Sequence, residues 1–228
     1  MLSRLFRSTG MAVLLAASAA LVVTNAHAQP NPTAHIAASE TTLANFLKDP
    51  DMDWLQRNFG RAKAVIIAPE IVKAGFIFGG SGGRVAVIAR DAKTGKWVGP
   101  AFYAMATASV GFQAGISVAE GVTLVMTDKG LNSLLATSFK IGADASVAAG
   151  PVGAGAKSDV VADLITFNRA KGVYGGLNLD GTVVTASDDW NSEFYGKKVL
   201  PPDILVRASV HNKAADKLLA QAAAAAKK

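Results

Sequence analysis

The fold is decided by residues 64–90, which read AVIIAPEIVKAGFIFGGSGGRVAVIAR. Residues 64–68 are apolar and rich in β-branched side chains, which favours a β-strand that ends at the following proline. Residues 74–78 and 84–90 predict two further strands. The glycine-rich sequence 79–83 between them predicts a tight hairpin connection. We therefore expect antiparallel strands that approach one another closely.

Strand-type sequence continues on the C-terminal side. Residues 104–118 hold only small or apolar side chains apart from Gln113, and we expect much of this run to be buried in strands over 102–126. Further strands are expected at 139–141, 143–148, 160–169 and 172–186, and helices after 127–128, at 188–194, from 201–202 and at 213–226.

Two helices are expected before the sheet. Ser39 suits the N-cap of the first helix, and Asp49 with Pro50 suits the start of the second. Two roles remain open for the apolar face of the first helix, namely contact with a membrane interface or packing on its own core. The residues considered for membrane contact are Leu43, Phe46, Leu47 and Trp54.

Residues 1–28 have the layout of a secretory signal peptide. Arg4 and Arg7 precede an apolar run over 11–23, and Ala26-His27-Ala28 places small residues where a signal peptidase cleaves. An uncleaved anchor is the alternative, although the run is short for a membrane span. The sequence thus predicts a periplasmic or secreted protein, peripheral to a membrane if bound to one, that begins at Gln29.

Composition excludes several classes of function. The chain has no cysteine, which excludes disulfides, thiol catalysis and attachment of lipid at the cleavage site. It has 23 Lys and Arg against 17 Asp and Glu; without the two arginines of residues 1–28 the net charge falls from +6 to +4. This mild basicity suits an anionic surface, whereas an aromatic content of 7% offers few stacking residues for nucleic acid.

Three patterns suggest chemistry only weakly. The sequence 79–83 matches the G-x-S-x-G pattern around Ser81, but a strand is expected after it where a helix is needed, and the only histidines after residue 28 are His35 and His211. The sequence 150–158 misses a phosphate-binding loop by one position. The alternating acids at 49, 51 and 53 lack the other calcium ligands of an EF-hand. We expect no enzyme activity, metal or cofactor.

Several basic residues lie beside the expected strands or in their turns. Phosphate groups of anionic phospholipids are their expected partners, and a solvated surface is the alternative reading for each one. The candidate lipid-binding residues are Lys63, Lys73, Arg84, Arg90, Arg169 and Lys171.

Several segments, taken in order, resemble the SYLF domain family of lipid-binding proteins. They are AKAVIIAP at 62–69, KAGFIFGG at 73–80, GPAF at 99–102, SVGFQAG at 109–115, LVMT at 124–127, GADASVAAGPVG at 142–153, KGVYGGLNLDG at 171–181 and YG at 195–196. The resemblance implies a single glycine-rich α+β domain with a curved, mostly antiparallel or barrel-like sheet flanked by short helices. The resulting division is 1–28 signal peptide, 29–38 flexible leader, 39–60 helical segment, 61–207 SYLF-like domain and 208–228 alanine-rich C-terminal helix.

The resemblance also implies a function. Eukaryotic members are similar in binding phosphoinositides and other acidic membranes, and some act with the cortical actin machinery, whereas bacterial relatives are exported. Members often carry Arg after the Gly-Pro-Val-Gly turn, where this chain has Ala154, which puts a headgroup site there in doubt. We therefore expect an exported, non-enzymatic protein that binds anionic phospholipid. A structural or protein-interaction module of the cell envelope is the alternative, and the oligomeric state stays open.

Overall fold

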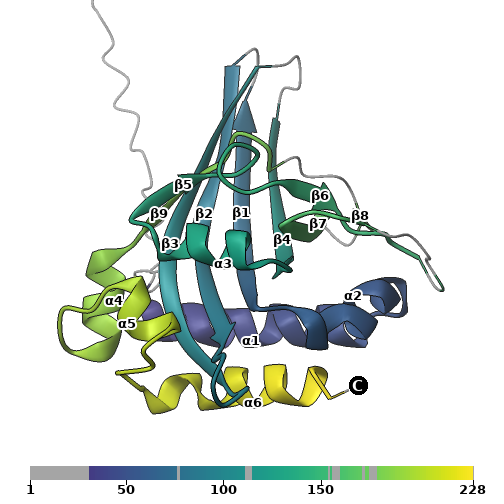
Figure 1. Ribbon diagram of the computed structural model, residues 1–228. Coiled ribbons are helices and arrows are strands. Elements are labelled where there is room, and N and C mark those ends of the chain that lie inside the picture. The colour runs from purple at the N-terminus through teal and green to yellow at the C-terminus, as the bar shows by residue number, and fades with distance from the viewer. Residues whose placement is uncertain are drawn as a thin grey trace, which may run out of the picture.

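The computed structural model describes residues 31–75, 78–110, 115–153, 155, 160–170, 173–174 and 179–227. Its strands are β1 Ala64–Gly75, β2 Phe78–Arg90, β3 Trp97–Val110, β4 Gly115–Val125, β5 Ser138–Lys140, β6 Val147–Ala149, β7 Leu164–Ala170, β8 Val173–Tyr174 and β9 Val183–Ala186. They form one curved sheet in the order β5-β9-β3-β2-β1-β4-β7-β6, with β8 paired to β7 (Figure 1). Among the named strands of the described residues, only β6 and β7 run parallel, which confirms the expected mostly antiparallel α+β architecture.

Helices cover both sides of this sheet. They are α1 Pro32–Lys48, α2 Asp53–Asn58, α3 Asp128–Leu135, α4 Asp188–Tyr195, α5 Pro201–Leu205 and α6 Asp216–Ala225, with single 3₁₀ turns at Pro50–Met52, Phe59–Arg61 and Lys213–Ala215. The first and last helices, α1 and α6, lie side by side across one end of the sheet (Figure 1). Within the described ranges, no helix combines the length and hydropathy that crossing a bilayer requires.

The N-terminal helix starts earlier than the sequence predicts. Asn31 is its N-cap and accepts a hydrogen bond of 2.8 Å from the backbone N–H of Ala34, and Pro32 fills the first helical position. Ser39, the expected cap, is instead fully buried in the middle of α1. The expected flexible leader at 29–38 is therefore wrong for residues 32–38, because Ile36 extends the buried apolar face of the helix by one turn.

The central strands are buried on both faces. In β1, Val65 and Ile67 face a first core formed with α1, α2, α4 and α6, whereas Ala64 and Ile66 face a second core formed with α3, α5 and β5. A strand covered on both sides cannot alternate between apolar and polar residues. This is why residues 64–68 form an unbroken apolar run.

Strand β1 continues through Pro69 instead of ending there. The pairing register shifts between Ile67 and Val72 against β2 and between Ala68 and Ile71 against β4, so the proline sits in an irregularity where no ladder hydrogen bond is lost. The residues 79–83, expected to form a hairpin connection, belong to β2; the connection falls at 76–77, outside the described residues.

Candidate functional site

The ends of four strands project beyond the helices (Figure 1). We call this part the blade and define it as residues 71–75 of β1, 78–83 of β2, 104–110 of β3 and 115–119 of β4. Its strands are the upper continuations of the same strands that form the core of the body. The blade is therefore held by the sheet itself and not by a loop.

One face of the blade is apolar and uncovered. The strand registers place its residues in two rows, first Val118, Val72, Gly82, Ala106 and Val183, then Ile116, Ala74, Gly80 and Ala108. The side chain of Ile116 is 74% exposed, and those of Val72, Val118 and Val183 are 39–42% exposed. The alanines at 74, 104, 106 and 108 are exposed as well. We call these exposed residues, together with Gly80 and Gly82, the open face.

The opposite face of the blade is apolar at its base, where Ile71, Met105 and Ala119 are buried in the second core, and polar above it. The row behind the open face consists of Ser117, Lys73, Ser81 and Thr107. Lys73 is the only charged residue among the described residues of the blade. An apolar face backed by a polar one is the pattern of a sheet that packs on one side only, yet within the described chain nothing packs on the apolar side.

This arrangement corrects the expectation that residues 104–118 are mostly buried. On the open face Ala104, Ala106, Ile116 and Val118 are exposed, because α1 and α4 cover only the lower part of this side of the sheet. A signal for exposure was present in the sequence at 116–118, where Ile, Ser and Val alternate as in a half-covered strand.

Polar and charged residues border the open face. Arg84 lies in the same row as Ala104, one row below Gly82, and Ala104 pairs in turn with Thr185 of β9. The end of the Val118–Val183 row is Lys140 of β5, an exposed residue that pairs with Val183 and so lies on the same side of the sheet. The carboxylate of Asp144 accepts a hydrogen bond of 2.7 Å from the Lys140 backbone N–H.

Arg84 is fixed by α4. Its guanidinium carbon lies 4.1 Å from the centre of the Trp190 ring, and it donates a hydrogen bond to Ser187. His35 of α1 packs edge-on against Trp190, with 5.4 Å between ring centres. Burial, and secondarily the charge of Arg84, lowers the pKa of His35 to about 4. This cluster holds α1 and α4 against the sheet directly below the blade.

Arg169 is fixed by two carboxylates. Its Nε lies 2.9 Å from Glu120 Oε1, and its Nη1 lies 3.5 Å from Asp49 Oδ2. The other carboxylate oxygen of Glu120 accepts a hydrogen bond of 3.0 Å from Thr42 of α1. The guanidinium also lies over the ring of Phe46 at 5.6 Å. Arg169 thus joins β4 and β7 to the N-terminal helices.

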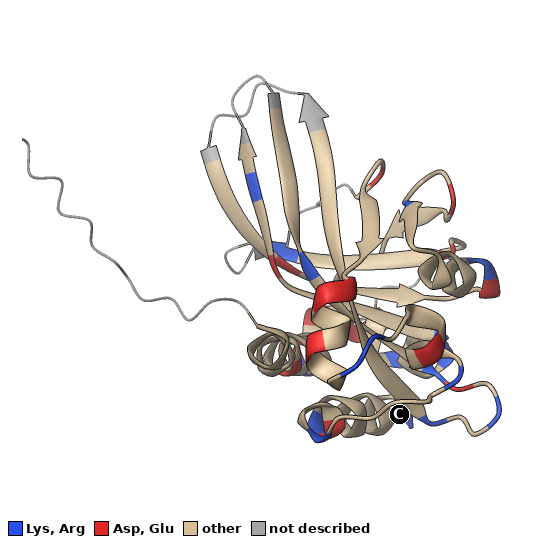
Figure 2. Cartoon of the chain, turned by 90° about the vertical axis from the view of Figure 1, so that its left-hand side faces the viewer, with Lys and Arg blue, Asp and Glu red and all other residues tan. Residues whose placement is uncertain are grey.

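The predicted basic residues do not form one cluster. Lys63 pairs with Asp128 at 2.8 Å, and Arg90 donates to the backbone oxygen of Gly60 at 2.7 Å. Lys171 and Ala154 lie outside the described residues. Figure 2 shows basic and acidic segments interspersed over the body, while the blade is almost free of them. Of the predicted residues, only Lys73 lies on the blade.

The apolar residues predicted for membrane contact lie in the core. Leu43, Phe46 and Trp54 are at most 6% exposed, and Leu47 packs partly buried against the same cluster. Packing on its own core, the alternative role of this helix, is the one that the structure has. Contact of these side chains with lipid would require α1 and α2 to leave the sheet.

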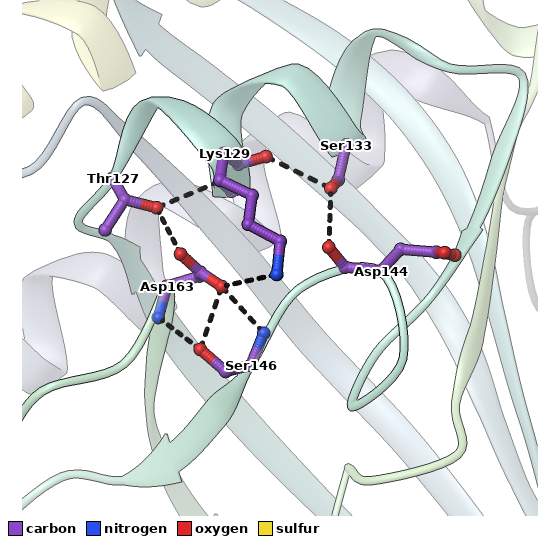
Figure 3. Close-up of polar contacts among 7 residues, drawn as sticks. Thr127, Lys129, Ser133, Asp144, Ser146 and Asp163 are labelled. Carbon is purple, nitrogen blue, oxygen red and sulfur yellow. Dashed lines mark hydrogen bonds and ion pairs between the residues drawn. The ribbon is translucent and has the colours of Figure 1, made fainter.

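A second polar cluster surrounds Asp163, just before β7 (Figure 3). Its carboxylate accepts hydrogen bonds from Thr127 Oγ1 at 2.5 Å and from the Ser146 N–H and hydroxyl at 2.9 and 2.8 Å. Lys129 Nζ lies 3.6 Å away. The bond from Thr127, followed by that from the Ser146 backbone, lowers the pKa of Asp163 to about 2. The carboxylate therefore ties the start of α3, the loop before β6 and the start of β7 together.

The serine of the G-x-S-x-G pattern does not have the geometry of a hydrolase nucleophile. Ser81 lies within β2, paired with Lys73 and Thr107, and not on the strand–turn–helix bend that exposes a hydrolase nucleophile. In the part of the chain that the structure describes, no group of three or more His, Asp or Glu side chains is arranged to hold a metal ion.

These features define a class of protein, a glycine-rich α+β domain whose central sheet extends past its helices as an amphipathic blade. The chain belongs to the Ysc84 family, described as Las17-binding protein actin regulator, whose model matches residues 106–225. This match confirms the resemblance to the SYLF domain family.

Curated relatives support the same assignment. The chain is 33% identical over 143 residues to LAS seventeen-binding protein 3 of Saccharomyces cerevisiae, covering 60% of this chain and 31% of the relative. It is 30% identical over 166 residues to Protein YSC84 of the same yeast, covering 70% and 35%. It is 29% identical over 150 residues to human SH3 domain-containing YSC84-like protein 1, covering 64% and 43%. The chain thus spans less than half the length of these relatives.

Proposed function

We propose that this chain is an exported, non-enzymatic protein that binds membranes containing anionic phospholipid. The observation that supports this function best is the open face of the blade. Soluble proteins seldom leave a contiguous apolar sheet face uncovered unless it meets a partner or a membrane. Here the only charged residue on the blade is a lysine, so the local charge favours an anionic surface.

The form of recognition we propose is contact with a surface and not enclosure of a headgroup. Four of the predicted basic residues are engaged by protein groups on separate parts of the body, namely Lys63, Arg84, Arg90 and Arg169. Guanidinium groups held by carboxylates or aromatic rings are poorly placed to enclose a phosphate. A net charge of +4 after residue 28 adds a long-range attraction that salt would screen.

Export is the second element of the proposal and rests on residues 1–28. The test is intact-mass analysis and N-terminal sequencing of the protein from fractionated expressing cells. The expected result is a periplasmic or secreted chain that begins at Gln29. A chain that retains residues 1–28 and remains in the cytoplasm would contradict export without bearing on lipid binding.

Vesicle sedimentation tests lipid binding. The purified protein is mixed at low salt with vesicles of phosphatidylcholine alone or of phosphatidylcholine with phosphatidylglycerol. We expect sedimentation with the anionic vesicles, and weaker sedimentation as salt is raised. Negligible binding to both kinds of vesicle would refute the proposed function.

A second candidate function is a protein-interaction module of the envelope. The family description and the name of a yeast relative refer to binding of the protein Las17, which shows that this domain occurs in chains with protein partners. Gel filtration and a pull-down from envelope extracts distinguish the two. A stable protein partner recovered without lipid would favour assembly.

A further inference from the structure

We infer that the open face of the blade is the part of the molecule that enters the membrane, with Val72, Ile116 and Val118 at the boundary between headgroups and acyl chains. Lys140, at the end of the Val118–Val183 row, would then contact the anionic headgroups. This inference rests on the proposed function and assigns a surface to it.

The composition of the open face makes three side chains prominent. Gly80 and Gly82 carry no side chain, and the neighbouring alanines carry only a methyl group, so β2 and β3 form a flat, low surface. Beside it stand Val72, Val118 and Ile116, which pair across β1 and β4 or follow one another along β4. Branched aliphatic side chains gain most from leaving water, so these three would supply most of the apolar contact.

The size of the open face argues for a membrane over a second copy of the chain. Its exposed apolar area is on the order of 500 Å², as large as the largest apolar patch of a typical monomer, which is often functional. A stable protein interface buries about 800 Å² on each partner and needs a complementary shape. A fluid bilayer needs no complementary shape, so a smaller apolar face is sufficient.

The charges around the open face fit an anionic membrane. Lys140 ends the Val118–Val183 row on the same side of the sheet, and Lys73 lies on the polar side of the blade. The described part of the blade has no acidic residue, and Glu120, directly below Val118 on β4, is paired with Arg169. An anionic headgroup at the end of the Val118–Val183 row therefore meets Lys140, and the nearby carboxylate of Asp144 is engaged by the Lys140 backbone N–H.

The strand geometry limits the depth of insertion. The two rows of the open face are two residues apart, about 7 Å along the strands, so the apolar contact is short in that direction. Among the described residues, Gly115–Val118 have no strand neighbour on the side away from β1. Because unpaired backbone groups do not enter the hydrocarbon core, the contact must stay shallow.

The first experiment compares two substitutions at similarly exposed valines. Val118 on the open face is 40% exposed, and Val206 at the end of α5, on the other side of the sheet, is 48% exposed. We expect Val118→Glu to lower the partition coefficient onto anionic vesicles about tenfold or more, because it replaces an apolar contact by a charge repelled by the headgroups. Val206→Glu changes the net charge by the same amount as Val118→Glu but lies away from the open face. It should therefore bind within about twofold of the unchanged protein.

The two hypotheses fail in distinguishable ways. If the unchanged protein binds no vesicles, the proposed function is refuted. If it binds and Val118→Glu binds equally well, this inference is overturned and another surface carries the function. Circular dichroism and thermal unfolding of each variant confirm that a loss of binding is not a loss of folding.

The second experiment places a reporter on the open face. The three native tryptophans are only 5–6% exposed, so an added tryptophan on the blade would dominate any change in emission on binding. We expect Ile116→Trp to shift its emission to the blue with anionic vesicles and to be quenched by lipids brominated near the headgroup. Val206→Trp should do neither. An unshifted Ile116→Trp signal on vesicles that carry the protein would overturn the inference, as would a lipid-free dimer that Ile116→Glu dissociates.

Discussion

Replacing Asp163 by Asn tests whether the cluster in Figure 3 holds three segments of the chain together. The carboxylate accepts hydrogen bonds from Thr127 and, twice, from Ser146, and it lies near the Lys129 ammonium. Lowering its pKa from 3.8 to about 2 corresponds to about 2 kcal/mol in favour of the ionised, folded form. An amide of the same size turns an NH₂ group toward these donors. We therefore expect a loss of about 2–3 kcal/mol in the free energy of unfolding at pH 7.

The assay is urea unfolding followed by fluorescence of the buried tryptophans, at pH 7 and in steps down to pH 2. A carboxyl whose pKa is lowered by folding stabilises the protein above pH 4 and loses that contribution as the pH falls toward 2. The difference between the unchanged protein and Asp163→Asn should therefore shrink over this range. Asp128→Asn is the control, since Asp128 is 78% exposed in its pair with Lys63 and should cost at most about 1 kcal/mol. Equal losses for the two variants would refute the reasoning.

Three further predictions concern contacts at the base of the blade. Folding lowers the pKa of His35 from 6.5 to about 4, so the unchanged protein should lose up to about 3 kcal/mol of its free energy of unfolding as the pH falls from 6.5 to 4. His35→Phe should not show this loss in urea unfolding, and an unchanged pH profile would contradict the prediction. Arg169→Met should cost about 3 kcal/mol, because it leaves the half-buried carboxylate of Glu120 unpaired; a loss below about 1 kcal/mol would contradict the pairing. Gly83→Ala should lower the midpoint of thermal unfolding by several degrees, about 2 kcal/mol, because its Cβ would lie 2.3 Å from the backbone oxygen of Glu70; an unchanged midpoint would argue against this close crossing.

The architecture could be predicted from the sequence where local chemistry decides it. The apolar run at 64–68 forms the centre of β1, and the turn at 127–128 caps α3 through a hydrogen bond from the Gly130 N–H to Thr127 Oγ1. The end of β1 was wrongly predicted at Pro69 because a bulge, which depends on both neighbouring strands, accommodates the proline. The sequence around Pro69 does not show how β2 and β4, which are distant along the chain, pair with β1.

The candidate site was less predictable for a related reason. An apolar residue marks a position that avoids water, but the sequence does not say whether another element covers it. Phe46 and Trp54 were considered for membrane contact, with packing on their own core as the alternative, and are covered by the body, whereas Ala106 and Val118 lie in a run expected to be mostly buried and are exposed. Lys140 was missed because only its pairing with Val183 brings it to the open face.

The order of strands in the sheet bears on where the folding unit begins. The family match starts at residue 106, inside β3, so β1 and β2 precede it. In the sheet, however, these two strands lie between β3 and β4. A fragment cut to the matched residues would consist of two half-sheets with no strand between them, and α6 would lose its contact with α1. A fragment that keeps the whole sheet and the contact between α1 and α6 must therefore begin no later than Asn31, the N-cap of α1.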